Sequence, residues 1–199
     1  MVKGDSGHAA VRRRQADRRA ATRAALMEAA RALFAEKGFA GTGREEIVER
    51  AGVTRGALYH HFASKADLFR AVYEQVENDL NEAIATAALA ATDPMEQLQL
   101  GTRAFLDAAA QPDVRRIVLL DAPSVLPPDV RRELMGRYGL GLMREALRAV
   151  MDAGEIERQP LEPLAHIVLA GLHEAATLVA DGADRDEVEA VVERFLARL

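Results

Sequence analysis

Hydrophobic residues recur at helical spacing along almost the whole chain, and the first clear stripe lies between residues 18 and 37. Its members fall at positions i, i+3, i+4, i+7 and i+8, which share one face of a helix. They are Leu26, Ala29, Ala30, Leu33 and Phe34. Gly38 follows the stripe, and glycine is common just after a helix C-terminus. The pattern predicts a first helix from about Arg18 to Lys37.

Two short helices are predicted next. An apolar pattern that begins at Ile47 ends at Gly52, which leaves room for about two turns over residues 45–51. Thr54 carries a hydroxyl that can cap a following helix, residues 55–61. That helix must end before residue 64, because Ser64-Lys65-Ala66-Asp67 has the form of a capping box. Two short helices joined by a turn that contains glycine predict a helix-turn-helix motif.

Longer helices are predicted in the middle of the chain. No glycine or proline interrupts residues 65–91, so a fourth helix of this length extends about 40 Å at 1.5 Å per residue. Such a helix is a natural lever between the N-terminal helices and the remainder. Further helices are predicted to begin at Asp93-Pro94, after Gln111-Pro112-Asp113 and at Pro127-Pro128, the last of them ending near Gly154.

The last two predicted helices differ from those before them. Residues 161–180 are apolar or small on nearly every face, which is typical of a helix covered on all sides. The segment from Asp184 is amphipathic and starts with a capping box. Two such helices favour a self-associating surface, and the residues predicted for this dimer interface are Ile167, Leu172, Val188, Val192 and Phe195. Because strand signals are almost absent, we predict an all-α fold of about nine helices.

Composition removes several classes of protein. The 199 residues are 49% hydrophobic and 29% charged, as in a globular protein with a core, and they include no cysteine, which excludes disulfides and thiolate chemistry. A signal peptide is not recognisable, and no apolar run reaches the roughly 18 residues that span a bilayer. Phosphate-binding loops and the common hydrolase motifs are missing. We therefore expect a cytoplasmic protein that is not an enzyme, with no cofactor, no metal and no membrane partner.

Charge is distributed unevenly, although the whole chain has a net charge of -5. Residues 1–65 contain 13 Lys and Arg against 7 Asp and Glu, whereas residues 66–199 contain 13 against 24. This separation predicts a head that binds a polyanion and a body that does not. A solvated basic face is the alternative, and charge alone does not decide between them.

The second short helix carries side chains suited to DNA. Arg55 has five donors that can reach guanine O6 and N7, while Gly56 and Ala57 let the backbone come close to the groove. Tyr59 can contact DNA or pack as a core ring, and Gly56 can also serve only to relieve crowding between helices. The adjacent histidines His60 and His61 are poor metal ligands, because neighbours on a helix point about 100° apart and a third ligand is missing.

The segment AGVTRGALYHHFASKADLF resembles the signature AGVS-x-G-x-x-Y-x-HF-x-x-K-x-x-L of the TetR/AcrR family of one-component transcriptional regulators. The upstream segment ALFAEKGFAGTGREEIVERAGV resembles the first two helices of that family. The resemblance implies a helix-turn-helix DNA-binding domain over residues 18–64, a ligand-binding and dimerisation domain over residues 65–199, and a homodimer. Residues 1–17 are then a basic arm, either entering the minor groove or forming a flexible tail.

Carried over by position, the resemblance implies contacts with double-stranded operator DNA at Thr42, Arg44, Thr54, Arg55, Gly56, Ala57, Tyr59, His60, His61 and Lys65. Two positions depart from the family pattern. Gly43 stands where a serine or threonine usually opens the second helix, and Glu45 stands where a basic or neutral residue is common. Glu45 either repels phosphate or pairs with a nearby arginine.

The resemblance also implies a small-molecule effector in the C-terminal body, which releases a repressor from a palindromic operator. His166, His173 and Thr177 align on one face of the apolar helix, where they line a pocket, face the dimer partner or are satisfied inside the bundle. The other predicted ligand-binding residues are Arg103, Phe105, Asp121 and Tyr138. A helical small-molecule carrier or protein-binding scaffold is the alternative function, and a DNA binder is distinguished from it by a steep loss of affinity with salt.

Overall fold

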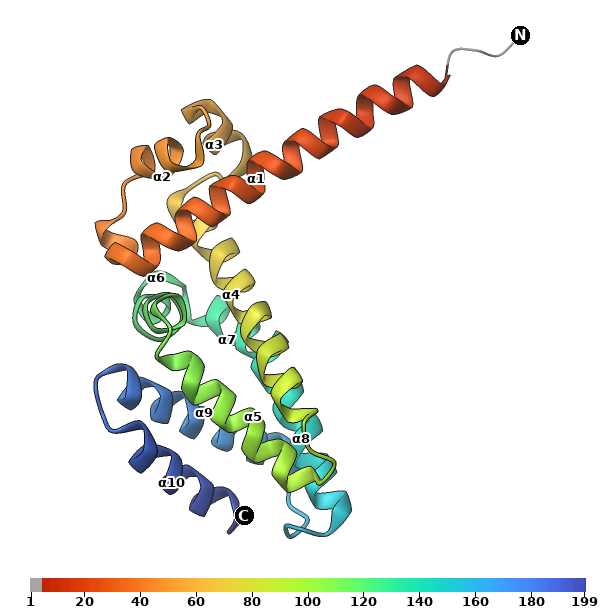
Figure 1. Cartoon of the computed structure of the whole chain (residues 1–199), viewed down its shortest axis with the longest axis vertical. Helices are drawn as coiled ribbons and strands as arrows, with labels where there is room; N and C mark the ends of the chain where they lie inside the picture. Colours follow the sequence, from red (N-terminus) through yellow and green to blue (C-terminus); the bar gives the residue numbers. More distant parts are fainter. Residues whose placement is uncertain (1–4) are drawn as a thin grey trace. The chain divides into compact units, whose positions relative to one another are not determined.

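The computed structural model describes residues 5–199, with side chains from residue 13 onward. This part of the chain contains ten α-helices, one π-helix and no strand (Figure 1). The all-α prediction is confirmed, with one more α-helix than the nine or so expected. The helices are α1 (Asp5–Gly41), α2 (Arg44–Ala51), α3 (Arg55–His61), α4 (Lys65–Ala88), α5 (Pro94–Ala109), η1 (Val114–Asp121), α6 (Ala122–Val125), α7 (Pro128–Arg137), α8 (Gly139–Ala153), α9 (Leu161–Ala180) and α10 (Arg185–Leu196).

The chain divides into two compact units. Unit 1 extends to Val72, and unit 2 comprises Tyr73–Leu199. The division therefore falls inside α4, after the predicted domain boundary at residues 64 and 65, where α4 begins. Each unit has a hydrophobic core of its own.

Unit 1 is built on the apolar stripe predicted for the first helix. All five stripe residues are buried, together with Ile47 of α2, Leu58 of α3 and Phe62 at its end. Three rings join α1 to the start of α4: Phe69 lies 5.3 Å from Phe34 and 5.2 Å from Phe39 between ring centroids, in edge contacts. Each large side chain fully removed from water stabilises the fold by about 1.5–3 kcal/mol. This core holds α2 and α3 in place.

Helix α1 begins earlier than predicted and, after an interruption at Gly38 where its end was predicted, continues to Gly41. Gly38 has φ 73°, a left-handed conformation that interrupts the regular helix and suits glycine. At the other end α1 begins at Asp5 rather than near Arg18. Its first turns lack an apolar stripe, but alanine, arginine and glutamine are good helix formers, and no glycine or proline interrupts residues 8–37.

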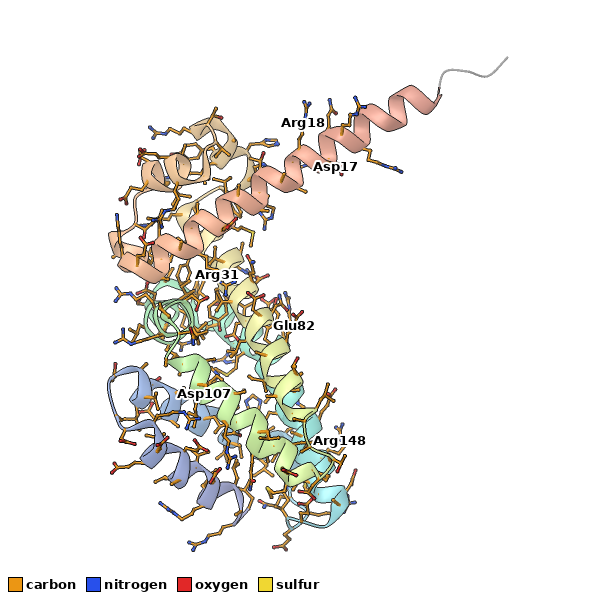
Figure 2. All side chains as sticks on the ribbon, viewed as in Figure 1. Asp17, Arg18, Arg31, Glu82, Asp107 and Arg148 are labelled. Atoms are coloured by element: carbon orange, nitrogen blue, oxygen red, sulfur yellow. The ribbon has the colours of Figure 1, made fainter. Side chains whose placement is uncertain are left out.

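The N-terminal half of α1 is exposed. Residues 13–20 are all exposed, and Figure 2 shows Asp17 and Arg18 projecting from this part of the helix. The predicted arm over residues 1–17 is therefore helical from Asp5 onward, while residues 1–4 lie outside the described residues.

Unit 2 is organised around α9, which packs against α5, α8, α10 and η1. Length and composition alone would let α9 cross a membrane, contrary to the sequence expectation. Its buried face, including Leu164, Val168 and Leu172, instead belongs to the core of this unit. We therefore describe α9 as a core helix.

Two elements of unit 2 differ from the sequence prediction. The helix expected from Pro127 to Gly154 is broken at Tyr138 into α7 and α8, with Gly139 beginning the second. Gly139 packs closely there, since an added Cβ would lie 3.3 Å from a Leu169 methyl group, which would have to shift. The segment after Asp113 is a π-helix rather than an α-helix, and Arg115 Nε donates to the Ala180 carbonyl at 2.6 Å.

Candidate nucleic-acid interface and ligand cavity

The start of α3 is fixed by Thr54. Its backbone is extended, and its hydroxyl oxygen accepts a hydrogen bond from the Ala57 amide at 3.3 Å, so the predicted N-cap is confirmed. The preceding turn contains Gly52 at φ 64°, which ends α2 in a left-handed conformation. The glycine turn and the threonine cap together set the direction in which α3 leaves α2.

Arg55 lies in the first turn of α3 and is exposed. Its guanidinium donates to the Tyr59 hydroxyl at 3.5 Å and lies 3.4 Å from the Glu45 carboxylate. The Tyr59 hydrogen bond, followed by charge effects from Tyr59 and Glu45, raises the pKa of Arg55, and the same bond lowers the pKa of Tyr59. Glu45 therefore pairs with an arginine, one of its two predicted roles.

Tyr59 stands between two arginines. The guanidinium carbons of Arg44 and Arg55 lie 5.7 and 5.8 Å from the centre of its ring, within the range of a cation–π contact. The Tyr59 side chain is 42% exposed, so it is not a packed core ring. Arg44, Arg55 and Tyr59 form one exposed polar cluster across α2 and α3, which we call the α3 cluster.

The remaining residues of α3 differ in exposure. His60 is exposed and His61 is half-buried, with their ring centroids 5.4 Å apart. Partial burial, and then the positive charges of His60, Arg19 and Arg23, lower the pKa of His61. Gly56 is exposed, and an added Cβ would meet only the Thr54 hydroxyl at 3.9 Å. Gly56 therefore does not relieve crowding, while Ala57 is half-buried.

Lys65 and Thr42 have structural partners that the sequence did not predict. Lys65 Nζ donates to the carbonyls of Phe39 at 2.7 Å and Thr42 at 2.9 Å, and it also lies over the Phe39 ring. Partial burial and then the charge of Arg44 lower the pKa of Lys65. Lys65 thus joins the start of α4 to the segment between α1 and α2.

Thr42 does not fit its predicted role in DNA contact. Its side chain is 2% exposed, and its hydroxyl lies within hydrogen-bonding distance of the Gly38 carbonyl at 2.8 Å and the Leu33 carbonyl at 3.2 Å. It is a buried residue that satisfies carbonyls at the end of α1. Gly43 caps α2 without a side chain, because its amide donates to Glu46 Oε2 at 3.0 Å.

Unit 2 contains a cavity of about 430 Å³. It is lined by α4, α5, α8 and α9, mostly with apolar side chains such as Leu80, Ile84, Leu142 and Leu172. Two of the predicted ligand-binding residues, Phe105 and His173, line this cavity, with ring centroids 5.4 Å apart. Burial lowers the pKa of His173, so its imidazole is held in the neutral form.

The other five predicted ligand-binding residues do not line the cavity. Arg103 pairs with Glu189 and Glu193, which ties α5 to α10. Asp121 lies 3.4 Å from Arg116 Nε. The other three are Tyr138, at the break between α7 and α8, His166, which is exposed, and Thr177, whose hydroxyl donates to the His173 carbonyl at 2.9 Å.

Sequence reasoning missed the contribution of α4 to the cavity. Glu77, Leu80, Asn81 and Ile84 line it from one face of α4. Glu77 is 6% exposed, and Tyr73 donates a hydrogen bond to its carboxylate. Burial raises the pKa of Glu77. The signal available in the sequence was a lone acid in the apolar register of a helix, at i+4 from Tyr73 and i−3 from Leu80.

The predicted dimer surface is partly corrected. Leu172 and Val192 are 5% and 8% exposed, so they belong to the core of unit 2 and are not available to a partner. Val188 is half-buried. Ile167 and Phe195 are exposed, and two further residues that were not predicted join them on α9 and α10, Leu178 and Val191. Ion pairs also link the helices of this unit. One joins Arg185 of α10 to Asp107 of α5, and Asp107 is labelled in Figure 2.

Two family models match the chain. Residues 26–72 match the model for bacterial regulatory proteins of the tetR family, and residues 95–199 match the model described as tetracyclin repressor-like, C-terminal domain. A solved TetR-family transcriptional regulator from Pectobacterium atrosepticum is similar to this chain, with a TM-score of 0.75 and 33% identity, covering 90% of this chain and 92% of that one.

Curated relatives match over shorter segments. The transcriptional activator FasR of Mycolicibacterium smegmatis is 35% identical over 85 residues, which cover 43% of this chain and 39% of FasR. The transcriptional regulator AcrR of Shigella flexneri is 33% identical over 99 residues, which cover 49% of this chain and 46% of AcrR. The matched segments thus span less than half the length of each of these two relatives.

Proposed function

Since the chain belongs to the TetR family of bacterial regulatory proteins, we propose that it is a cytoplasmic transcriptional regulator that binds operator DNA through α3. The observation that carries the proposal is the α3 cluster. Arg44, Arg55 and Tyr59 present cationic and hydroxyl donors on an exposed surface, beside the short side chains of Gly56 and Ala57. Donors of this kind suit both base edges and phosphates in a major groove.

We propose a separate role for each residue of this interface. Arg55 is the proposed base reader, because a guanidinium can bind guanine O6 and N7 with two donors. Glu45 and Tyr59 hold that guanidinium in the free protein and must release or share it when DNA binds. His60, which is exposed, and the half-buried His61 are proposed phosphate or base contacts, together with the backbone at Thr54.

We propose that the regulator acts as a homodimer through α9 and α10. The exposed apolar residues of these helices support this interface, since four large side chains would otherwise remain in water: Ile167, Leu178, Val191 and Phe195. A twofold dimer places two α3 helices for a palindromic operator with half-sites about one helical turn apart.

The cavity supports regulation by a small molecule. A volume of about 430 Å³ with mostly apolar walls is within the range of ordinary ligand sites. A ligand that binds one conformation better by about 1.4 kcal/mol changes operator affinity tenfold. We propose release from the operator as the result of ligand binding, so that the protein is a repressor.

The test begins with selection of bound sequences from a random DNA pool, followed by affinity measurements at several salt concentrations. We expect a palindromic consensus and a steep loss of affinity as salt rises. Arg55→Ala should weaken specific binding by about 1–3 kcal/mol and relax preference at one base position in each half-site. A protein that selects no sequence and shows no salt dependence would instead be a helical carrier or scaffold.

A further inference from the structure

The cavity of unit 2 is lined by a buried carboxyl group, and its described lining contains no lysine or arginine to pair with it. Glu77 lines the cavity and is 6% exposed. Its described partner is the Tyr73 hydroxyl, which is neutral, and among the described residues a positive charge, that of Arg131, acts on the pKa of Tyr73 but not on that of Glu77. Buried carboxylates are normally paired, because burial of an isolated charge is costly.

The charged residues around the cavity are all acidic. The side chains that line it include Glu77 and Glu145, and no lysine or arginine is among them within the described part of the chain. His173 is the remaining titratable residue in the lining, and its burial favours the neutral imidazole. A bound anion would therefore meet the buried Glu77 carboxyl group with no compensating charge, whereas a cation would be complementary to it; Glu145 is exposed and screened by water.

We propose that this cavity binds a monocation with an apolar body, whose protonated amine pairs with the Glu77 carboxylate. The amine supplies the positive charge that the described lining of the cavity lacks, and the body lies against Phe105, Leu142 and Leu172. The claim that this cation is the effector of the regulator rests on the proposed function. The pairing itself is a property of unit 2 alone.

The shape of the site fits such a molecule. The residues of α4 that line the cavity recur at helical spacing from Glu77 to Ala88, which is about 16 Å along the axis at 1.5 Å per residue. The carboxyl group of Glu77 is buried at one end of this row, whereas Leu89, just beyond the other end, is 80% exposed. An elongated ligand can thus enter past Leu89 with its charged end inward.

A second buried polar group faces the same space. Thr102 of α5 lines the cavity, is 4% exposed, and its hydroxyl has no hydrogen-bond partner among the described residues. Such a hydroxyl is expected to be satisfied by another polar group. An amine has several N–H donors, so it can serve the Glu77 carboxylate and also the Thr102 oxygen.

Three probes that share one body and differ in the head group test the proposal. They are 4-phenylbutylamine, 4-phenylbutanol and 5-phenylpentanoate, which are cationic, neutral and anionic at pH 7. Binding is measured by titration calorimetry on the full chain without DNA. We expect the amine to bind at least about tenfold more tightly than the alcohol, as for a charge-assisted bond. The carboxylate should bind more weakly than the alcohol.

Two matched variants locate the interaction. Glu77→Gln keeps the shape of the side chain and should reduce amine affinity about tenfold while changing alcohol affinity less than about twofold. Glu145→Gln removes the exposed carboxylate of the lining and should change amine affinity less than about twofold, since water and salt screen it.

The outcomes are decisive in either direction. Equal affinity for amine and alcohol in the unsubstituted protein overturns the proposal without any variant, so a folding defect in Glu77→Gln cannot obscure the result. Loss of amine preference in Glu145→Gln but not in Glu77→Gln also overturns it. These binding measurements contain no DNA, so they are independent of operator binding. If the protein binds operator DNA but shows no preference for the amine, this inference is rejected and the proposed function stands. Amine binding without operator binding rejects the proposed function alone.

Discussion

The two units use their charged residues in opposite ways. In unit 1 the guanidinium groups of Arg44 and Arg55 are exposed around Tyr59 and are held by weak contacts on the surface. In unit 2 the Glu77 side chain is buried beside a cavity, and its one described hydrogen-bond partner is Tyr73. An exposed cationic cluster suits a large polyanion that binds at the surface, whereas a buried acid suits a small ligand that is enclosed.

This difference also separates what a substitution does in each unit. Removing an exposed donor changes binding and leaves the fold intact, since surface contacts contribute little to stability. Removing a buried charge changes the free energy of unfolding as well. The following predictions test whether the two units keep to this rule.

The largest effect on operator affinity is expected from substitutions in the proposed dimer interface of α9 and α10. The double variant Val191→Asp and Phe195→Asp places charges on two exposed apolar positions of α10 and should give monomers in sedimentation. Operator affinity should then fall by about 100-fold or more, because each head binds one half-site alone. Leu89→Asp is the control, since Leu89 is equally apolar and more exposed but lies outside α9 and α10. An unchanged dimer would remove the interface assignment.

Lys65 of unit 1 is an exception, because it is a predicted DNA contact whose substitution should also change stability. Its amine donates hydrogen bonds to two backbone carbonyls. Lys65→Met keeps the aliphatic stem and removes the donors to Phe39 and Thr42. We expect the free energy of unfolding to fall by about 1.5–3 kcal/mol in chemical denaturation. Lys37→Met, which removes only the exposed pair with Glu46, should cost less than about 1 kcal/mol. Full stability with uniformly weaker DNA binding would make Lys65 a phosphate contact alone.

Glu77→Gln should stabilise the ligand-free protein by about 1 kcal/mol at pH 7 to 8. Burial raises the pKa of Glu77 above its ordinary value of 4.5, so the stability linked to its proton is present below that value and lost as pH rises through the folded-state pKa. The gain in the variant should therefore grow with pH in thermal unfolding and vanish in acid. A variant less stable than the parent at pH 8 would contradict the burial argument.

The smallest effect is expected at the start of α2. Gly43→Ser adds a capping hydroxyl where the backbone is extended and an added Cβ would lie 3.5 Å from Glu46, an ordinary contact. We expect a gain of a few tenths of a kcal/mol, about 0.3, in chemical denaturation. Gly52→Ala is the opposite control, because φ 64° strains any other residue by about 1–2 kcal/mol. A loss of stability in Gly43→Ser would show that Glu46 already satisfies this end of α2.

Local signals predicted local structure well. Thr54, Asp93 and Asp184 were expected as helix caps, and each accepts a hydrogen bond from an amide two or three residues later. Gly38 was expected to end the first helix, and its positive φ interrupts α1 at that position, although the helix continues to Gly41. These features depend on neighbours within one turn, so a sequence pattern contains the whole interaction.

Predictions that needed packing were less accurate. Val191 and Val192 are adjacent on the amphipathic helix α10. Val192 is buried and Val191 is exposed, because only one side of α10 packs against α5 and α9. Arg103 was expected in a ligand pocket but lies against two acids of α10, which are about 90 residues away in sequence. Periodicity places a residue on a face without saying what that face meets.

The sequence by itself determined the helical class, most helix ends, the position of α3 and the residues that α3 exposes, because caps, glycine turns and apolar spacing act over a few residues. The tertiary structure alone decided that Thr42 is buried, that Lys65 binds two carbonyls, and that Glu77 faces a cavity with neither lysine nor arginine among its described lining. These properties arise from contacts between helices far apart in sequence, where burial sets the energy of a charge or hydroxyl.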